Sequence, residues 1–211
     1  LATLRAKLLE QRAQRIRPSF DDKILADWNG LMIAALSRAA VVFQKPEWLV
    51  LAQRAFASVT RNLSAGGDRL FHAYRAGQAK APATASDYAN MTWAARRLFE
   101  ATLDASYLEH AKAWSRVLQD HYQDSDAGGY FTSADDTSDV VVRLKSAGDD
   151  AVPSANTIHA TNLRALSILT GEDHYEQTAN RLLNAFRADI ARNPVGHCGL
   201  IAASLDTDAL V

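Results

Sequence analysis

Trp48-Leu49-Val50-Leu51-Ala52 places an aromatic residue one helical turn before an alanine, and the pattern recurs as Tyr107-Leu108-Glu109-His110-Ala111 and Tyr175-Glu176-Gln177-Thr178-Ala179. Residues four positions apart lie on the same helix face, so each pair can pack against the preceding helix and let two backbones approach. The copies begin 59 and 68 residues apart. This spacing exceeds the common solenoid repeats of about 34 to 47 residues and suits a helix pair followed by a long loop.

Apolar residues at helical spacing, bounded by polar caps and Gly or Pro, predict seven helices. They are Ala2 to Arg15, a helix capped by Asn29 that ends before Pro46, Glu47 to Leu63, Asp87 to Leu103, Ser106 to Tyr122, Ser154 to Leu169 and Asp173 to Arg192. Two stretches of strand-like composition, Arg69 to Arg75 and Val140 to Lys145, fall between them. We therefore predict an all-α fold, a section of an α/α toroid built of helix hairpins with short β-hairpin-like loops on one rim. A flat solenoid is the alternative.

The composition indicates one globular domain. The chain has 211 residues, of which 48% are hydrophobic and 22% charged, enough for one well-buried core. Its formal charge of −1 comes from well-mixed acidic and basic residues, so we expect neither nucleic acid nor a membrane as a partner. We interpret residues 1–211 as a single α/α-toroid domain, and as an incomplete section of a longer barrel because they are too few to close six hairpins. Apolar helix faces left exposed in such a section predict self-association.

The reactive residue types suggest neither a metal nor a cofactor. Cys198 is the only cysteine, which excludes an internal disulfide and suits a reducing, cytoplasmic compartment. The six histidines have no spacing typical of a zinc site. There is no Gly-rich phosphate loop and no Gly-x-Ser-x-Gly elbow, which argues against nucleotide chemistry and serine hydrolysis.

The densest polar cluster spans residues 17–30 and comes directly before a predicted buried helix. Trp28 could stack on a sugar ring, Asn29 could hydrogen-bond its hydroxyl groups, and Asp22 could act as an acid or base if burial or a like charge raised its pKa. In the structural alternative, Asn29 and Asp27 cap the helix and Asp22 pairs with Arg17 or Lys23. The cluster is a candidate site for a polyhydroxylated ligand.

Two further clusters also open helices. Asp87 and Tyr88 begin one of them. A role of Asp87 as an N-cap or first-turn anion favoured by the helix dipole is the simpler interpretation, and the alternative places Asp87 and Tyr88 on the same rim as the first cluster. Asp149 precedes another, and Asn156 falls in its first turn, where its amide could bind a ligand oxygen. Acid and base carboxylates for glycoside chemistry would have to stand about 5 to 10 Å apart across a cavity.

His72 lies in the strand-like loop with Tyr74 and Arg75. A structural histidine is the simpler interpretation, and the alternative is a ligand-binding residue on the same rim.

Several motifs together resemble one known family. They are Arg12-Ala13-Gln14-Arg15-Ile16-Arg17-Pro18, Asp21-Asp22-Lys23-Ile24-Leu25, Trp28-Asn29-Gly30-Leu31-Met32-Ile33, Asp87-Tyr88-Ala89 and Asp149-Asp150-Ala151-Val152-Pro153-Ser154-Ala155-Asn156. In order, they resemble the toroid part of the YyaL-like and spermatogenesis-associated thioredoxin-domain proteins. The resemblance implies a thioredoxin-like domain followed by an (α/α)6 barrel similar to six-hairpin glycosidases and N-acylglucosamine 2-epimerases.

The chain departs from the family pattern in two ways. It has no Cys-x-x-Cys, so any redox role of the thioredoxin-like domain is absent from these residues. The family places Gly-Asn-Ser after the Pro-Ser, whereas Ala155 and Thr157 flank Asn156 here. This weakens any requirement for glycine in that loop.

The resemblance implies a carbohydrate-like pocket at the barrel mouth and leaves two main hypotheses. The first is a sugar epimerase or glycosidase with Asp22, Asp87 and Asp149 as acid/base groups. In it, a small carbohydrate is bound by Trp28, Asn29, Tyr88, Asn156 and His72. The second is a non-catalytic toroid that binds a ligand or protein and assists a thioredoxin-like domain; a bare scaffold is a third reading. Two carboxylates facing one pocket would favour the first, and carboxylates that are capped or paired the second.

Overall fold

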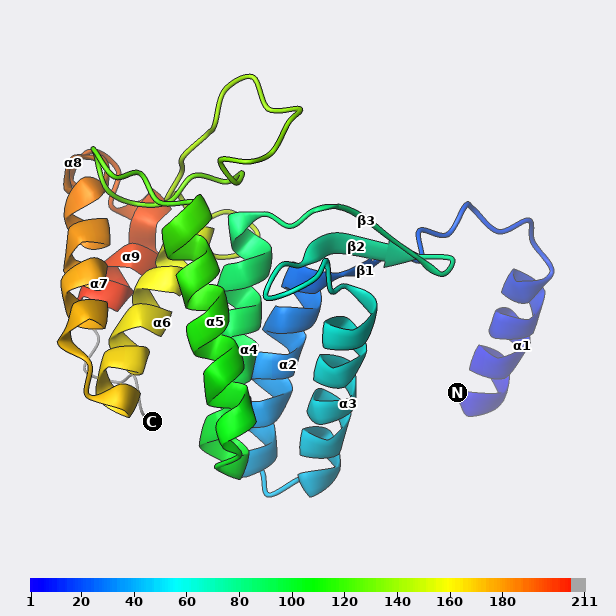
Figure 1. The fold of residues 1–211 in the computed structure, drawn as a ribbon. Coiled ribbons are helices and arrows are strands. Elements are labelled where there is room, and N and C mark those ends of the chain that lie inside the picture. The colour runs from blue at the N-terminus through cyan, green and yellow to red at the C-terminus, as the bar shows by residue number, and fades with distance from the viewer. Residues whose placement is uncertain (206–211) are drawn as a thin grey trace.

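The computed structural model describes residues 1–205 and consists mainly of three successive helical hairpins (Figure 1). Each hairpin joins two antiparallel helices through a short turn. They are α2 (Ala26–Val42) with α3 (Pro46–Asn62), α4 (Ala85–Thr102) with α5 (Ala105–His121), and α6 (Ala155–Thr170) with α7 (Asp173–Ala185). The predicted α/α-toroid architecture is confirmed.

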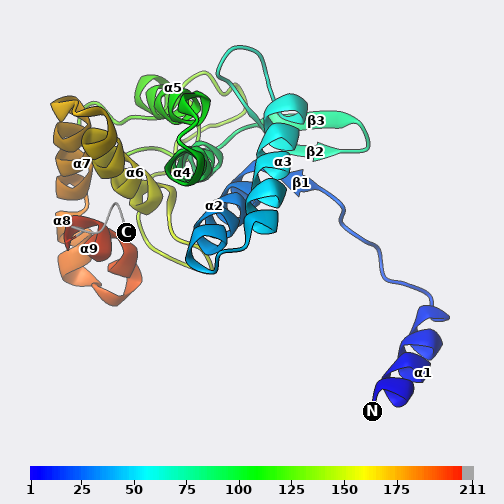
Figure 2. The same ribbon diagram turned by 90° about the horizontal axis from the view of Figure 1, so that it is seen from below.

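The hairpins form two layers. The first helices pack side by side, α2 on α4 and α4 on α6, and each second helix packs against its own partner. Seen along the helices, α2, α4 and α6 line the inside of an arc, with α3, α5 and α7 outside them (Figure 2). The main core lies between the two layers.

The aromatic and alanine pairs form contacts between these helices. Ala52, Ala111 and Ala179 are fully buried. The Tyr107 ring meets Phe56 of the neighbouring hairpin edge-on, with ring centroids 5.2 Å apart. The repeated pattern thus marks the outer helix of each hairpin.

Helix α2 begins four residues earlier than predicted, so the prediction that Asn29 caps it is wrong. Leu25 is the N-cap, and Asn29 lies in the first turn, where its Nδ2 donates to the Leu25 carbonyl oxygen at 2.8 Å. Next to it, a Cβ on Gly30 would lie 2.6 Å from the carbonyl carbon of Asn90. Glycine at this position therefore lets α2 and α4 pack backbone to backbone.

A three-stranded antiparallel sheet covers one end of the hairpins. Its strands, in the order β1-β2-β3, are β1 (Ile24–Leu25), β2 (Phe71–Arg75) and β3 (Gln78–Pro82). Leu25 pairs with Ala73, which brings the segment before α2 against the loop between α3 and α4. The strand-like character predicted for Arg69 to Arg75 is confirmed.

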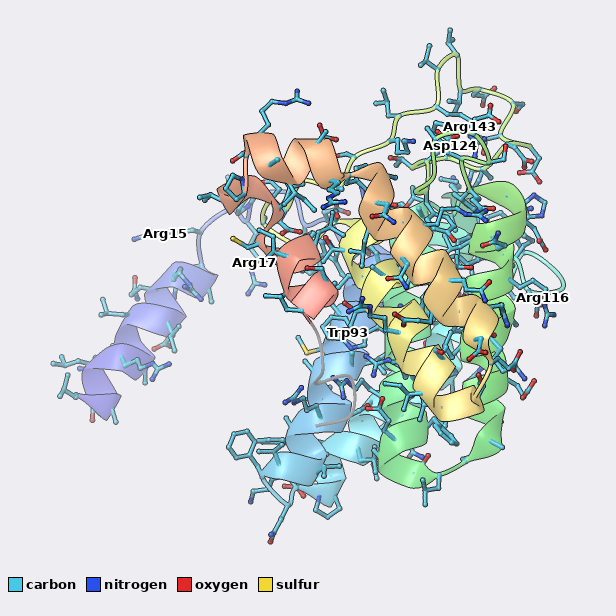
Figure 3. All side chains as sticks on the ribbon, turned by 90° about the vertical axis from the view of Figure 1, so that its left-hand side faces the viewer. Arg15, Arg17, Trp93, Arg116, Asp124 and Arg143 are labelled. Atoms are coloured by element: carbon cyan, nitrogen blue, oxygen red, sulfur yellow. The ribbon has the colours of Figure 1, made fainter. Side chains whose placement is uncertain are left out.

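The prediction of strand-like structure for Val140 to Lys145 is wrong. Residues 140–145 form an irregular loop in which Val141, Val142 and Leu144 are exposed. The backbone bond from Thr132 N to Leu144 O is isolated, and no paired strand covers the apolar side chains among the described residues. In Figure 3, Asp124 and Arg143 lie in this loop region, well above Trp93 at the mid-height of the helices.

The ends of the described chain also differ from expectation. The helix predicted from Asp173 to Arg192 is interrupted at the buried Phe186, after which α8 (Arg187–Arg192) begins. A short 3-10 turn, η1 (Val195–His197), leads to α9 (Cys198–Leu205), which packs on α6 and was not predicted. Helix α1 (Ala2–Ala13) has no buried residue and stands apart from the hairpins (Figure 1). No helix within residues 1–205 is both long and apolar enough to span a membrane.

Candidate functional site

The three polar clusters all lie at the N-terminal ends of the inner helices. Helices α2, α4 and α6 begin at the same end of the molecule, beside the sheet and the long loops, at the top of Figure 1. We call this end the rim. Parallel inner helices are the reason why segments far apart in sequence meet there.

The rim contains a group made of Asp27, His72 and Asp87. Asp27 is in the first turn of α2, His72 is on β2, and Asp87 is in the first turn of α4. His72 Nδ1 lies 3.0 Å from each carboxylate oxygen of Asp87, and the Asp27 backbone N–H donates to Asp87 Oδ1 at 2.9 Å. The sheet and two helix ends therefore assemble this group, which we call the rim triad.

Asp87 is the anchor of the rim triad. Its side chain is fully buried, and its Oδ2 accepts hydrogen bonds from the Thr84 backbone N–H at 2.7 Å and the Thr84 hydroxyl at 2.9 Å. These bonds form a capping box at the start of α4. Both carboxylate oxygens are thus engaged, so Asp87 orients its neighbours and is shielded from a ligand.

The pKa of His72 is raised, chiefly by its hydrogen bond with the Asp87 carboxylate. Nδ1 is the ring nitrogen that faces Asp87, so it carries the proton, and among residues 1–205 no hydrogen bond engages Nε2. The side chain is 31% exposed. Nε2 is therefore the nitrogen available to a ligand.

The pKa of Asp27 is also raised, first by burial and then by the negative charge of Asp87. Its Oδ1 accepts from the Trp28 backbone N–H at 2.7 Å. An oriented imidazole beside a carboxyl group with a raised pKa is an arrangement that can exchange protons with a bound molecule.

Sequence reasoning selected His72 and Asp87 singly but took Asp27 for a cap. The missing signal was the pairing of β1 with β2, which carries Asp27 to the histidine strand.

The remaining predicted residues near α2 lie at the surface of the rim. Trp28 is 64% exposed. Asp22 is exposed and forms an ion pair with Arg75 Nε of β2, as the structural alternative of a basic partner anticipated, though with a different arginine. Asn29 uses its amide nitrogen within α2. Trp28 therefore offers a free aromatic surface, while Asp22 is neutralised.

Two predicted ligand-binding residues are buried and engaged. The Tyr88 hydroxyl accepts the Leu70 backbone N–H at 2.8 Å. The Asn156 amide accepts the Tyr130 N–H at 2.8 Å and donates to the carbonyls of Tyr130 and Ser146 at 2.9 and 2.8 Å. The two side chains hold the rim loops against the helices.

Asp149 connects two helix starts. Oδ1 accepts from the Ser154 N–H and the Thr157 hydroxyl, each at 3.2 Å, and Oδ2 accepts from the Gly199 N–H at 2.7 Å. The carboxylate thereby ties α6 to α9. The three carboxylates predicted as catalytic are therefore paired or engaged in caps, and His72 and Asp87 are joined by a hydrogen bond.

The ligand atoms of the rim triad lie within 4.8 Å of one another and could in principle hold a metal ion. The donor set fits poorly, because a metal would have to displace the hydrogen bonds that Asp87 accepts from Thr84, Asp27 and His72. A second group, His121 with Asp135 and Asp136, is more open, but both oxygens of Asp136 accept hydrogen bonds from Arg69, at 2.8 and 2.9 Å.

Solved structures share this fold. The cellobiose 2-epimerase of Spirochaeta thermophila matches with a TM-score of 0.66 and 20% identity, over 81% of this chain and 44% of the epimerase chain. A family 76 α-mannanase of Bacteroides thetaiotaomicron matches with a TM-score of 0.66 and 15% identity, over 94% of this chain and 56% of the mannanase chain. The protein is therefore an α/α-toroid protein with the helix arrangement of the six-hairpin glycosidases and epimerases.

Sequence comparison identifies the particular relatives, although no family model matches the chain. Spermatogenesis-associated protein 20 of Rattus norvegicus is 33% identical over 199 residues, and that of Homo sapiens is 30% identical over 203 residues. Each alignment covers 90% of this chain and 25% of the relative. The chain is homologous to spermatogenesis-associated protein 20, as the motifs predicted, and spans about a quarter of its length.

Proposed function

We propose that the protein is sugar-active and that His72 and Asp27 exchange protons with a small carbohydrate bound at the rim. One observation carries the proposal: His72 Nδ1 is held by both oxygens of the buried Asp87, while Nε2 has no partner among the described residues. An imidazole fixed in this way has a defined tautomer and a single reactive nitrogen.

The local electrostatics suit proton transfer in both directions. The Asp87 carboxylate raises the pKa of His72 and so favours its protonated form. Burial raises the pKa of the Asp27 carboxyl group above its ordinary value and so favours its protonated form. One group can therefore accept a proton from the ligand while the other returns one.

The arrangement favours epimerase or isomerase chemistry over glycoside cleavage. Cleavage by the common route needs two carboxyl groups about 5 to 10 Å apart, each in contact with the substrate. Asp87 is buried, Asp22 is paired with Arg75, and Asp149 caps α6 and α9. His72 and Asp27 fit removal and return of a proton at a sugar carbon beside a carbonyl. The likeness to a cellobiose 2-epimerase agrees with this choice.

Trp28 follows Asp27 in the first turn of α2, and its ring is exposed. Aromatic rings commonly provide an apolar platform with a polar edge for a ligand ring. We assign Trp28 as the stacking surface of the carbohydrate.

A second candidate is a non-catalytic toroid that binds a ligand or protein beside a thioredoxin-like domain. The observation in its favour is that all three carboxylates predicted as catalytic are paired or engaged in caps. In this second candidate function, the rim binds a ligand or protein but transfers no proton.

We also propose that the chain is one domain, and a section of a ring that further hairpins of a longer protein complete. The chain spans 25% of spermatogenesis-associated protein 20 and 44% of the epimerase toroid, and its inner helices form an open arc (Figure 2).

The decisive experiment follows a sugar by proton NMR in D2O. The enzyme hypothesis expects solvent deuterium to enter the C–H next to the carbonyl carbon of a reducing sugar such as cellobiose or mannose. His72→Gln should reduce this rate by about 100-fold or more, the usual contribution of a general acid or base. His121→Gln is the matched control, because His121 forms a similar 3.0 Å contact with Asp135 away from the rim triad. It should leave the rate unchanged.

Thermal unfolding with the same sugars separates the two candidates. A ligand at 100 times its dissociation constant adds about 2.7 kcal/mol of stability. Stabilisation that Trp28→Ala abolishes, without deuterium exchange, would establish the binding toroid. Absence of both effects in a folded protein would reject a sugar function.

A further inference from the structure

The inner face of the arc carries a second group of polar residues, well below the rim. On α4, Asn90, Trp93 and Arg97 follow one another at helical spacing and share one face. Arg38 of α2 and Arg97 of α4 each lie 12 positions after the first residue of their helix, from 26 to 38 and from 85 to 97. At 1.5 Å per residue both lie about 18 Å below the rim, at matching depth.

Arginines of α2 and α4 gather at this depth. Among the described residues, no hydrogen bond or ion pair engages the exposed guanidinium of Arg38. Arg97 Nη1 donates to Glu100 Oε2 at 2.7 Å, but the other oxygen of Glu100 accepts from Arg96 at 2.6 Å. One carboxylate is thus shared by two arginines, and Arg38 adds a further cation.

Two buried donors in the same place have no acceptor. Neither the Nε of Arg97 nor the Nε1 of Trp93 has a hydrogen-bond partner among residues 1–205. A buried polar atom without a partner is costly, and the Oδ1 of Asn90 on the same face also has none among residues 1–205. These unpartnered atoms lie on the same face as Arg97 and mark it as polar.

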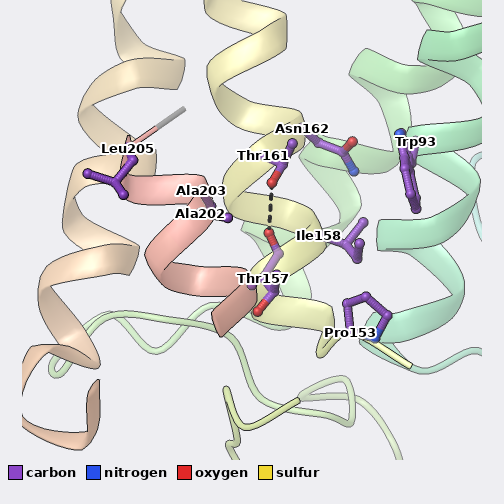
Figure 4. A pocket seen from close by; sticks show the side chains of 10 residues that line it. Trp93, Pro153, Thr157, Ile158, Thr161, Asn162, Ala202, Ala203 and Leu205 are labelled. Carbon is purple, nitrogen blue, oxygen red and sulfur yellow. Dashed lines mark hydrogen bonds between the residues drawn. The ribbon is translucent and has the colours of Figure 1, made fainter. Parts of the chain in front are cut away.

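Adjoining cavities provide the space. One of about 200 Å³ is lined by Ser37, Arg38, Arg97 and Glu100, and a second of about 380 Å³ continues past Arg38 and Arg97 to Trp93. The small side chains of Ala34, Ala35 and Ala39 keep the second one open. Trp93 also forms a wall of a third cavity, of about 400 Å³, toward α6 and α9 (Figure 4).

We propose that the groove between α2 and α4 is a second ligand site, for a small molecule with a phosphate or carboxylate group on a ring. Arg38 and Arg97 bind the anion, because guanidinium groups match the oxygens of phosphate and carboxylate. Trp93 lines the groove and contacts the ring. The cavities fit a small molecule, and the site is separate from the rim triad and independent of its chemistry.

Isothermal titration calorimetry on the full chain tests the site with glucose 6-phosphate, glucuronate, inorganic phosphate and glucose. We expect at least one anionic sugar to bind more tightly than glucose, and its affinity to fall as salt rises. The phosphate and carboxylate arms identify the preferred anion. Arg38→Gln and Arg97→Gln should each weaken binding about tenfold or more, the usual loss for a charged hydrogen bond.

The controls separate this site from other effects. Arg54→Gln removes the same charge from an exposed position on α3 and should leave the affinity within twofold. His72→Gln disables the rim triad and should also leave anion binding intact, so this site and the proposed function can fail separately. If glucose binds as tightly as the anionic sugars, or if Arg54→Gln weakens binding as much as Arg38→Gln, the proposal is wrong. Should both glutamine variants fail to fold, the anion preference and salt dependence of the unaltered protein decide.

Discussion

Asp87 shows how one buried carboxylate serves both the fold and the site. It completes the capping box of α4, accepts the Asp27 backbone N–H at the start of α2, and orients His72 on β2. Three elements therefore depend on one charge. Because of this coupling, protonation of His72 changes the free energy of unfolding of the whole protein.

The first prediction concerns the pH dependence of stability. The folded-state pKa of His72 lies above its unfolded value, so the stabilisation is fully present below the unfolded pKa of about 6.5 and is lost as the pH rises through the folded-state pKa. In urea unfolding between pH 5.5 and 8.5, the wild type should exceed His72→Gln most at the acidic end. His121→Gln controls for the loss of an imidazole. A difference that grows with pH would contradict the assignment of the Asp87 contact.

The second prediction concerns His159, a fully buried histidine on α6. Neither ring nitrogen has a hydrogen-bond partner within residues 1–205, and burial lowers the pKa of His159 to about 3. Its ring meets Tyr130 edge-on at 4.6 Å. Phenylalanine keeps that contact and removes two unpaired polar atoms, so His159→Phe should be neutral or stabilising by about 1 to 2 kcal/mol at pH 7.

The acid limb of the stability curve provides the check on His159. A histidine with a lowered folded-state pKa costs stability as the pH falls below about 6.5, because only the unfolded chain takes up the proton. His159→Phe should therefore flatten the stability between pH 6.5 and 4 relative to the wild type. A loss of more than about 2 kcal/mol at pH 7 would show that the imidazole nitrogens are engaged.

At the scale of elements, the third prediction is that Gly30→Ala disrupts the contact between α2 and α4. The added methyl group would lie 2.6 Å from a backbone carbon and 2.7 Å from the carbonyl oxygen of Asn90, neither of which can rotate away. Overpacking of this kind costs about 1 to 3 kcal/mol or more, which outweighs the gain of about 1 kcal/mol from alanine in a helix. Chemical denaturation measures the difference.

A matched substitution in the same helix calibrates this prediction. Ala35→Gly changes the backbone preference at an exposed position of α2 in the opposite sense and should cost about 1 kcal/mol. If Gly30→Ala proves as stable as the wild type, the two helices lie farther apart than described.

The elements were predictable where local pattern and tertiary packing agree. The pairs Trp48 with Ala52, Tyr107 with Ala111 and Tyr175 with Ala179 mark outer helices because their alanines must be buried. The pattern failed at Val140 to Lys145, because β-branched residues form a strand only where a neighbour pairs with them. It also failed at α9, where Pro194, Gly196 and Gly199 interrupt the helical period.

At the scale of the whole molecule, the rim as the place of the candidate site follows from the sequence, since each polar cluster directly precedes or opens an inner helix. The composition of the rim triad does not. Asp27, His72 and Asp87 are separated by 45 and 15 positions. The packing of α2 on α4 brings Asp27 to Asp87, and the pairing of β1 with β2 brings the strand of His72 to the start of α2. Pairing between short strands that are distant in sequence leaves no local sequence pattern. The sequence therefore suggested only a capping role for Asp27.

The last prediction is that the chain self-associates through the C-terminal end of α2. Val41, Val42 and Phe43 are 60, 63 and 64% exposed and form an apolar edge next to the inner face. Burial of a side chain such as Phe43 contributes about 1.5 to 3 kcal/mol. Phe43→Ser should therefore weaken association by about 10- to 100-fold.

Sedimentation velocity over a range of concentrations measures this association. The sedimentation coefficient of the wild type should rise with concentration, and that of Phe43→Ser should rise far less. Val50→Ser removes a comparably exposed apolar side chain from the outer helix α3 and should behave as the wild type does. If the wild type stays monomeric at high concentration, the exposed apolar edge of α2 does not drive association and the prediction is wrong. If Val50→Ser weakens association as much as Phe43→Ser does, the contact does not depend on the edge of α2 alone.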